Sequence, residues 1–278
     1  MSLKNKIDFA VVIRVKNANP NGDPLNGNRP RTDYEGFGEI SDVCLKRKIR
    51  NRMLAEGAEV FVQSADNNVD GMLSLKARAE SEEWGLGKDV FDSKKTSNEK
   101  LTKLACAKWL DTRSFGQLFA FKTKAGGLSL GIRGPVTIQS AYSVEPVNIV
   151  SSQIAKSVNG VEDKKAKSSD TLGMKHRVDS AVYVTYGAMS PQLAVRTGFD
   201  ADDAQAIKDA LLMLFEGDAS SARPEGSMSV EKLVWWEHDS GLGKYSSAKV
   251  HGSLSVAPDG SLEIQELEGL VPEVLEGR

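Results

Sequence analysis

The order of apolar segments in this 278-residue chain predicts an α+β protein with a ferredoxin-like βαββαβ core. A β-branched run at 7–15 predicts a buried strand, and an amphipathic, cation-rich helix is predicted to follow it. Extended segments at 128–147 and 178–189 then precede the strongest helical pattern, at 200–217, and a further strand at 233–237. Without the insertions between them, these elements give the order strand, helix, strand, strand, helix, strand.

A long loop rich in turn-forming residues connects the first strand to the first helix. The stretch from Asn19 to Gly38 contains three prolines and four glycines, which disfavour regular structure. A structureless connection of this length inside a compact domain is uncommon, and is usually functional or disordered. Ser41 is a good N-cap for the helix that follows, and Gly57 is placed to end it.

The predicted first helix has one apolar and one basic side. Leu45, Ile49 and Met53 recur every four residues and form the apolar stripe. The cations are predicted to point away from it, and no acidic residue lies between positions 43 and 55. These cations are Lys46, Arg47 and Arg50. A basic run of this kind is often only a solvated helix face, but the presence of Arg29 and Arg31 in the preceding loop favours a polyanion as ligand.

Two segments interrupt the core pattern. Residues 61–115 are largely polar and weakly periodic, apart from a short helix predicted at 101–110, and we interpret them as an insertion that elaborates the core. Residues 149–178 are rich in Lys and Ser and are predicted to form a protruding arm between two strands. An ordinary flexible surface loop is the alternative for this second segment. We therefore predict one domain over residues 1–278 with two elaborations.

Composition limits the cellular setting and the chemistry. Apolar residues make up 40% of the chain, and no apolar segment reaches the length of a membrane span. The first residues do not resemble a signal peptide, and two distant cysteines give neither a disulfide framework nor a thiolate metal site. We therefore expect a cytoplasmic protein. Its three histidines lack metal-ligand spacing, and we expect neither a bound metal nor a cofactor.

Charge is unevenly distributed, although the formal net charge is only −2. Residues 1–189 contain 29 Lys and Arg against 22 Asp and Glu, whereas residues 190–278 contain 7 against 16. A basic face and an acidic face would allow copies of the chain to stack head to tail. The alternative is an acidic segment that only aids solubility.

Motifs for catalysis or for base-specific RNA reading are scarce. The phosphate-loop patterns GxGxxG and GxxxxGK[ST] are absent from the sequence, as are GxSxG and HExxH. Asp23, Asp33 and Glu35 could hold Mg²⁺ for phosphodiester cleavage, although turns also favour Asp. Tyr183 and Tyr186 do not match the aromatic RNP1 pattern. Without catalytic or base-reading motifs, the mode of RNA binding that the sequence allows is sequence-independent contact with phosphate and the 2′-OH.

Two motifs resemble a known family. The first spans residues 19–51 and contains NPNGDP, NRPR and SDVCLKRKIRN; the second is GIRGPVTIQSAYSVEPV, at 131–147. Together with the order of elements along the chain, they resemble the backbone subunit of a type I CRISPR surveillance complex (Cascade), with subtype I-C as the closest match.

The resemblance implies an RNA-recognition-like palm, in which residues 61–115 form fingers and residues 149–178 a thumb hairpin that displaces a base of the RNA. Subunits of this family are not enzymes. They bind CRISPR guide RNA through its sugar–phosphate backbone and polymerise head to tail with the other Cascade subunits. The filament presents the guide for pairing with target DNA. The residues that the resemblance assigns to RNA binding are Asn19, Asn21, Arg29, Arg31, Lys46, Arg47, Arg50, Arg133, Gly134, Lys175, His176 and Arg177.

Two other functions remain open at this point. Backbone subunits of the related type III complexes cleave target RNA with an acid in the loop after the first strand, so a Mg²⁺-dependent ribonuclease that uses Asp23 or Asp33 is one alternative. A ferredoxin-like oligomerisation module without nucleic acid is the other, because the fold alone does not determine function. The motifs are of type I character, which favours the non-catalytic role.

Overall fold

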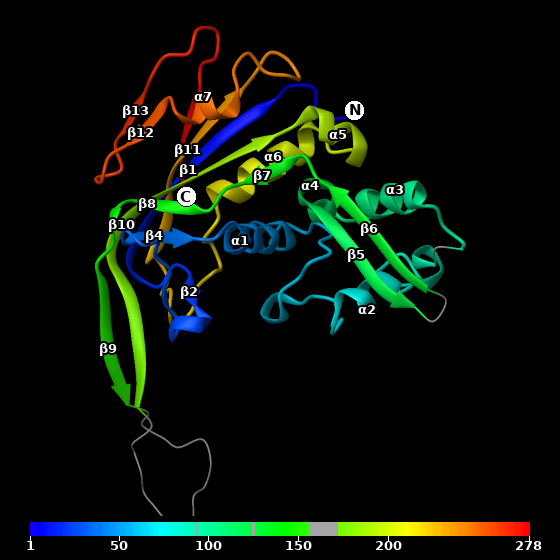
Figure 1. Cartoon of the computed structure of the whole chain (residues 1–278), viewed down its shortest axis with the longest axis horizontal. Coiled ribbons are helices and arrows are strands. Elements are labelled where there is room, and N and C mark those ends of the chain that lie inside the picture. Colours follow the sequence, from blue (N-terminus) through cyan, green and yellow to red (C-terminus); the bar gives the residue numbers. More distant parts are fainter. Residues whose placement is uncertain (93, 124–125, 156–171) are drawn as a thin grey trace, which may run out of the picture.

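A large antiparallel sheet forms the centre of the molecule, and helices lie along one of its faces (Figure 1). The computed structural model describes residues 1–92, 94–123, 126–155 and 172–278. The strands are hydrogen-bonded in the order β14-β11-β1-β10-β8-β4, and β7 and β9 also pair with β10. Their bounds are β1 (Ile7–Ala18), β4 (Phe37–Ile40), β7 (Val136–Ile138), β8 (Ala141–Pro146), β9 (Ile149–Ala155), β10 (Leu172–Met189), β11 (Met228–Glu237) and β14 (Glu273–Glu276).

Strand β1 lies inside the sheet because it is apolar on both of its faces. Phe9, Val11 and Ile13 point into the main hydrophobic core. Ala10, on the opposite face of the strand, belongs to a separate apolar cluster. β10 and β11 pair with β1 on either side. The α+β class that the sequence predicts is confirmed, with a large antiparallel sheet.

Two helices cover the face of the sheet to which Phe9 points. Helix α1 (Asp42–Ala55) begins where the sequence predicts, because the Ser41 Oγ accepts a hydrogen bond from the Cys44 N–H at 3.3 Å. Helix α6 (Ala201–Leu212) begins with a capping box formed by Asp200 and Asp203. The shorter α5 (Pro191–Thr197) precedes α6. The apolar sides of α1 and α6 both contribute to the main core.

The segment interpreted as an insertion forms a unit with its own core. It contains α2 (Leu75–Glu80), α3 (Asn98–Lys108), α4 (Leu110–Phe115) and the hairpin of β5 (Gly116–Thr123) and β6 (Gly126–Arg133). Its aromatic centre includes Phe61, Phe91, Trp109 and Phe119, and the Phe61 and Trp109 ring centroids lie 4.6 Å apart. We call this region, residues 60–133, the inserted unit. It continues past the expected end at 115 because the β5–β6 hairpin completes its core.

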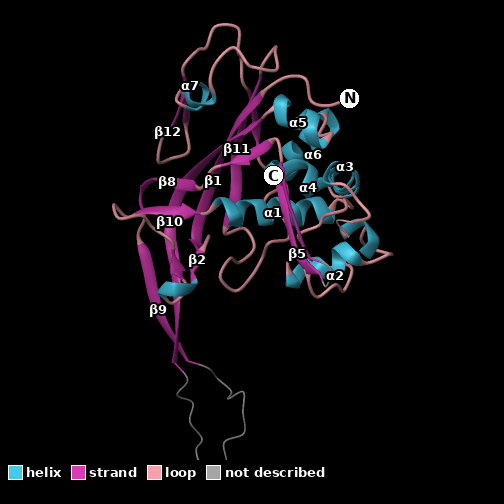
Figure 2. Ribbon diagram, turned by 45° about the vertical axis from the view of Figure 1, so that its right-hand side comes forward, coloured by secondary structure: helices cyan, strands magenta, loops and turns pink. Residues whose placement is uncertain are grey.

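The C-terminal part of the chain covers the other face of the sheet (Figure 2). It contains α7 (Ser247–His251), β12 (Leu254–Val256) and β13 (Leu262–Ile264). Val250 and Leu254 pack on Ala10 and Trp236 of the sheet. At the tip of the β12–β13 hairpin, the Asp259 carbonyl accepts a hydrogen bond from Arg14 at 2.6 Å. None of the helices in the described part of the chain is long and apolar enough to cross a membrane.

A buried carboxylate connects this C-terminal covering to the start of β1. Asp8 is fully buried and accepts a hydrogen bond from the His238 Nε2 at 2.8 Å, while the Lys6 ammonium lies 2.9 Å from the same carboxylate. The Nδ1 of His238 accepts from the Lys244 N–H, so the proton of this neutral imidazole is on Nε2. His251 lies 3.6 Å from the second oxygen of Asp8.

The attachment of the C-terminal covering should weaken at acidic pH. Burial lowers the pKa of His251 below its ordinary value of 6.5, and the charge of Asp8 only partly opposes this. The unfolded chain therefore binds a proton at this site more readily than the folded chain, so stability falls as the pH drops through about 6.5. We expect urea unfolding between neutral pH and about pH 5.5 to show a larger loss of stability for the wild type than for His251→Gln. An identical loss in both proteins would contradict the assignment to His251.

Candidate nucleic-acid interface

Each of the three cations predicted to point outward from α1 is paired with a carboxylate. Lys46 lies 2.9 Å from Asp42, one helical turn earlier. Arg47 lies 2.6 Å from Asp66, and Arg50 lies 2.9 Å from Asp111. The partners of Arg47 and Arg50 come from the inserted unit, so the sequence of the helix itself does not reveal them.

The expectation that Arg50 points outward is wrong. Only 14% of its side chain and 1% of the Asp111 side chain are exposed. Asp111 also accepts hydrogen bonds from the backbone N–H groups of Phe61 at 2.7 Å and Val62 at 3.0 Å. The Arg50 guanidinium lies 5.1 Å from the centre of the Phe115 ring. Arg50 therefore joins α1 to the inserted unit.

Arg47 is the most exposed of the three, with 55% of its side chain accessible. Its Nη2 lies 2.6 Å and 2.8 Å from the two carboxylate oxygens of Asp66, whose side chain is 68% exposed. Lys46 is less accessible, at 26%. An exposed ion pair of this kind contributes little to stability. Arg47 is thus held in place by a contact that is easily exchanged.

The amide side chains of the long loop are used within the protein. Asn19 is buried, and its Nδ2 donates to the Asn28 carbonyl at 2.7 Å. The Oδ1 of Asn21 accepts from both the N–H and the hydroxyl of Ser41, at 2.9 and 2.8 Å. Asn19 therefore does not present its side chain to a ligand as expected, and Asn21 holds the junction between the loop and α1. Sequence spacing could not distinguish these roles from RNA contact.

The loop meets the arm at the Ser151 hydroxyl. Arg29, in the short strand β3 (Arg29–Pro30), donates from Nη1 to the Ser151 Oγ at 3.2 Å. The same hydroxyl lies 2.8 Å from the Nδ1 of His176, its cross-strand partner in β10. The arm leaves the sheet at this point, as Figure 1 shows for β9 and β10. Two of the predicted residues, Arg29 and His176, are thus brought together.

The predicted cations next to Arg29 and His176 in the sequence differ in their exposure and in their ion pairs. Lys175 is exposed, and makes no ion pair with any residue that the structure describes. Arg177 is half-buried, and its Nε is buried without a hydrogen-bond partner. Arg31 lies 3.6 Å from the carboxylate of Asp23. The predicted arm lysines Lys156, Lys164, Lys165 and Lys167 lie outside the described residues.

Arg133 and Gly134 lie at the end of β6, where the chain passes to β7. Arg133 is exposed, and Gly134 is buried. A Cβ atom on Gly134 would lie 2.2 Å from the Ser114 carbonyl oxygen and 2.4 Å from the Gly116 nitrogen. The resemblance assigns Gly134 to RNA binding, whereas the backbone that lies close to it in this structure is the protein's own.

The loop carboxylates shape turns. Asp23 accepts from the Leu25 N–H at 3.1 Å, and Asp33 accepts from the N–H groups of Glu35 and Phe37 at 3.0 and 2.8 Å. Across the described ranges, no group of three or more His, Cys, Asp or Glu side chains is arranged to hold a metal ion. The observed role of both aspartates is the one that turn chemistry predicts.

Neither tyrosine on the central strand is free to stack on a base. Tyr183 is fully buried in the main core. Tyr186 stacks on His251, with ring centroids 5.0 Å apart, beneath the C-terminal covering. RNA-recognition domains use aromatic side chains on the open sheet face. This mode of base recognition requires an open sheet face, and in this protein the C-terminal part of the chain covers that face.

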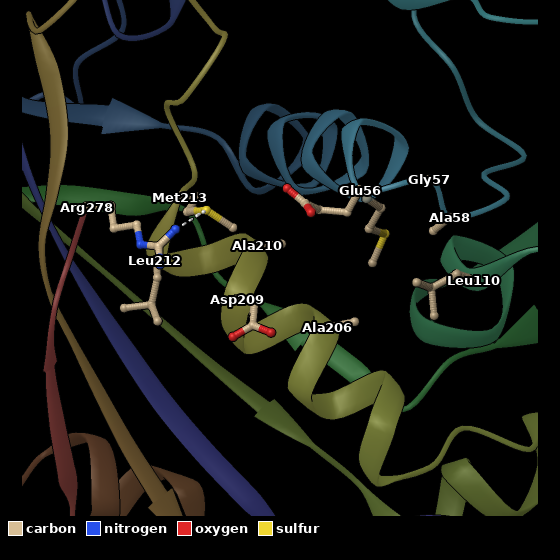
Figure 3. A pocket seen from close by; sticks show the side chains of 11 residues that line it. Glu56, Gly57, Ala58, Leu110, Ala206, Asp209, Ala210, Leu212, Met213 and Arg278 are labelled. Carbon is tan, nitrogen blue, oxygen red and sulfur yellow. Dashed lines mark hydrogen bonds between the residues drawn. The ribbon is translucent and has the colours of Figure 1, made fainter.

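A pocket of about 570 Å³ lies between the C-terminal ends of α1 and α6 (Figure 3). Its apolar lining includes Met53, Leu110 and Met213, and the carboxylates of Glu56 and Asp209 and the guanidinium of Arg278 also line it. Helix C-termini carry partial negative charge. Two carboxylates and this partial charge face a single cation, which disfavours a polyanion, so we place the pocket outside the nucleic-acid interface.

Comparisons with known proteins point to one family. A family model described as CRISPR-associated protein Cas7 matches residues 5–270. A CRISPR-associated protein Cas7 of Haloferax volcanii is 22% identical over 292 residues, which cover 99% of this chain and 82% of that protein. A chain of a solved CRISPR RNA-guided surveillance complex, described as pre-nicking, aligns at 16% identity and a TM-score of 0.48, covering 83% of this chain and 75% of that one. A chain of another such complex aligns at 14% identity and 0.44, covering 83% and 68%.

Removing Arg50 should destabilise the fold. Arg50→Ala leaves the buried Asp111 carboxylate without its cation, and breaking a buried pair in this way costs about 3–5 kcal/mol. Lys103→Ala is a matched control, because it removes the cation of an exposed pair with Glu99 in the inserted unit. Urea unfolding measures both. If the two variants lost equally little stability, the structural role given to Arg50 would be wrong.

Substitution by alanine should destabilise the protein at Gly134 but not at Gly131. Gly134→Ala forces a Cβ against the backbone of the α4–β5 turn and should lower the unfolding free energy by about 1–3 kcal/mol. Gly131→Ala, three residues earlier and inside β6, meets nothing within 4 Å. Thermal unfolding of the two variants tests this, and similar midpoints would refute the steric explanation.

Proposed function

Because the chain belongs to the CRISPR-associated Cas7 family, we propose that it is a non-catalytic backbone subunit of a type I surveillance complex, of subtype I-C by its motifs. It binds CRISPR guide RNA through the sugar–phosphate chain and polymerises head to tail along it. With the other Cascade subunits, the filament presents the guide for pairing with target DNA.

The meeting of loop and arm at Ser151 carries this proposal. Arg29 and His176 share the Ser151 hydroxyl, and Lys175 precedes His176 in β10, on the other face of the strand. Among the described residues, neither Arg29 nor Lys175 forms an ion pair. Cations whose charge is not already neutralised are the ones that can bind phosphate. Arg47 on α1 is the next candidate, because its pair with Asp66 is exposed.

The architecture supports the palm, fingers and thumb interpretation. The strand order β11-β1-β10-β8, with α1 and α6 on one face, is consistent with a ferredoxin-like palm. We interpret the inserted unit as the fingers and the β9–β10 arm as the thumb. Figure 1 shows α1 between the arm and the inserted unit.

The covered sheet face supports recognition of the RNA backbone rather than its bases. The C-terminal covering occupies the face on which other RNA-binding domains stack bases, and Tyr186 is engaged with His251. Contacts from Arg29 and Lys175 are directed to charge, which every nucleotide carries. The guide sequence is then left to base pairing.

Binding of single-stranded RNA should depend on Arg29 in a manner independent of sequence. Arg29→Ala removes one phosphate contact, so the slope of log affinity against log salt should become shallower by about one unit. The change should be equal for unrelated RNA sequences. Arg196→Ala is a matched control, because Arg196 is an exposed arginine on α5. Filter binding or fluorescence anisotropy at several salt concentrations measures the effect.

An unchanged slope for Arg29→Ala, in a wild type that binds RNA, would move the interface elsewhere. Failure of the wild type to bind RNA would reject the function itself and favour an oligomerisation module. The same samples incubated with Mg²⁺ should keep the RNA intact. Regular cleavage that Asp33→Ala abolishes would instead favour the ribonuclease.

A further inference from the structure

The Asp66 carboxylate forms an ion pair with Arg47, whose guanidinium lies on the exposed side of α1. Both of its carboxylate oxygens lie within 2.8 Å of the Arg47 Nη2. With 55% and 68% of the two side chains accessible, water reaches the pair from outside. The neighbouring pair of Arg50 and Asp111, by contrast, is almost entirely enclosed. Of Arg47 and Arg50, Arg47 is therefore the one whose partner can leave without exposing the core.

The backbone on either side of Asp66 is anchored. Before it, the N–H groups of Phe61 and Val62 donate to the buried Asp111 carboxylate. Asp66 itself lies in the 3₁₀ turn Ala65–Asn67, and after the turn the Val69 N–H donates to the Gln63 Oε1 at 3.1 Å. The segment is thus fastened at both ends, and its turn holds a carboxylate against Arg47.

We propose that Asp66 takes the place of an RNA phosphate on Arg47, and that phosphate displaces it when RNA binds. This inference rests on the proposed function and adds a residue that determines its specificity. A carboxylate and a phosphate each offer a guanidinium two acceptor oxygens, so one can replace the other. The exchanged pair is solvent-exposed and therefore weak.

The exchange would favour polymeric RNA over small anions. A free phosphate that displaces Asp66 replaces one anion with another and gains little. A polynucleotide already held at other cations, such as Arg29, delivers a further phosphate at high local concentration, so it displaces the carboxylate more readily. Asp66 thereby raises the threshold for binding without adding a contact to the RNA.

The test is Asp66→Asn, which keeps the shape of the side chain and removes its charge. The matched control is Asp89→Asn, in the same unit, where an exposed carboxylate pairs with Lys95 at 2.7 Å. Single-stranded RNA of two unrelated sequences is the probe. We expect Asp66→Asn to bind about three- to tenfold more tightly with a similar salt slope, because Arg47 contacts phosphate in both complexes, and we expect Asp89→Asn to match the wild type. Thermal unfolding verifies that all variants are folded.

Repeating Asp66→Asn in an Arg47→Ala variant separates an effect that acts through Arg47 from a general effect of removing negative charge. If Asp66 acts through Arg47, Asp66→Asn should add little in that background. Equal gains for Asp66→Asn and Asp89→Asn would show a general charge effect and overturn the inference. No gain for Asp66→Asn in a wild type that binds RNA would also overturn it, yet leave the proposed function standing. If neither the wild type nor any variant binds RNA, the proposed function is rejected and the inference with it.

Discussion

The ion pair between Arg50 and Asp111 is the constraint on which the arrangement of the interface depends. Asp111 receives the Arg50 guanidinium from α1 and two backbone N–H groups from the start of the inserted unit. In a second pair, the inserted unit supplies the cation and a helix supplies the carboxylate. Arg113 of the inserted unit donates two hydrogen bonds, each of 2.7 Å, to Asp203 of α6. Buried pairs of this kind specify geometry more than they add net stability. They fix the inserted unit to the helices, and so they place Asp66 over Arg47.

Cations on this protein fall into two groups according to what neutralises them. Arg50, Arg113 and the buried Lys48 each have an acidic partner inside the protein, and they hold elements together. Arg29 and Lys175 have no such partner among the described residues, and lie where the loop meets the arm. A count of Lys and Arg along the sequence does not distinguish the groups, because their acids are distant in the chain. The basic run on α1 is therefore a poor guide to which cations bind.

Local patterns predicted the elements well, and tertiary contacts explain what they missed. The β-branched run of β1, the Ser41 cap of α1 and the helical pattern of α6 are signals within a few residues, and the structure contains all three. The outward position of Arg50 was wrong because its partner is 61 residues away. The C-terminal covering of the sheet was missed because its strands are short, and its apolar residues gain a partner only from the far side of β1. The resemblance assigned Gly134 to RNA binding, and no local signal identifies the protein backbone that lies against it.

The internal neutralisation of the α1 cations bears on the proposed assembly of copies along one RNA. The chain has a net charge of −2, and much of its α1 charge is neutralised internally. Under the proposed function, each cation that is not neutralised internally would add one phosphate contact, so neutralising the α1 cations would weaken RNA binding by a single copy. Copies aligned on one RNA strand add their contacts at high effective concentration. Affinity for a long RNA would then arise from repetition, while Asp66 on Arg47 would keep unrelated anions from a lone subunit. In the proposed function, internal neutralisation and head-to-tail assembly therefore complement each other.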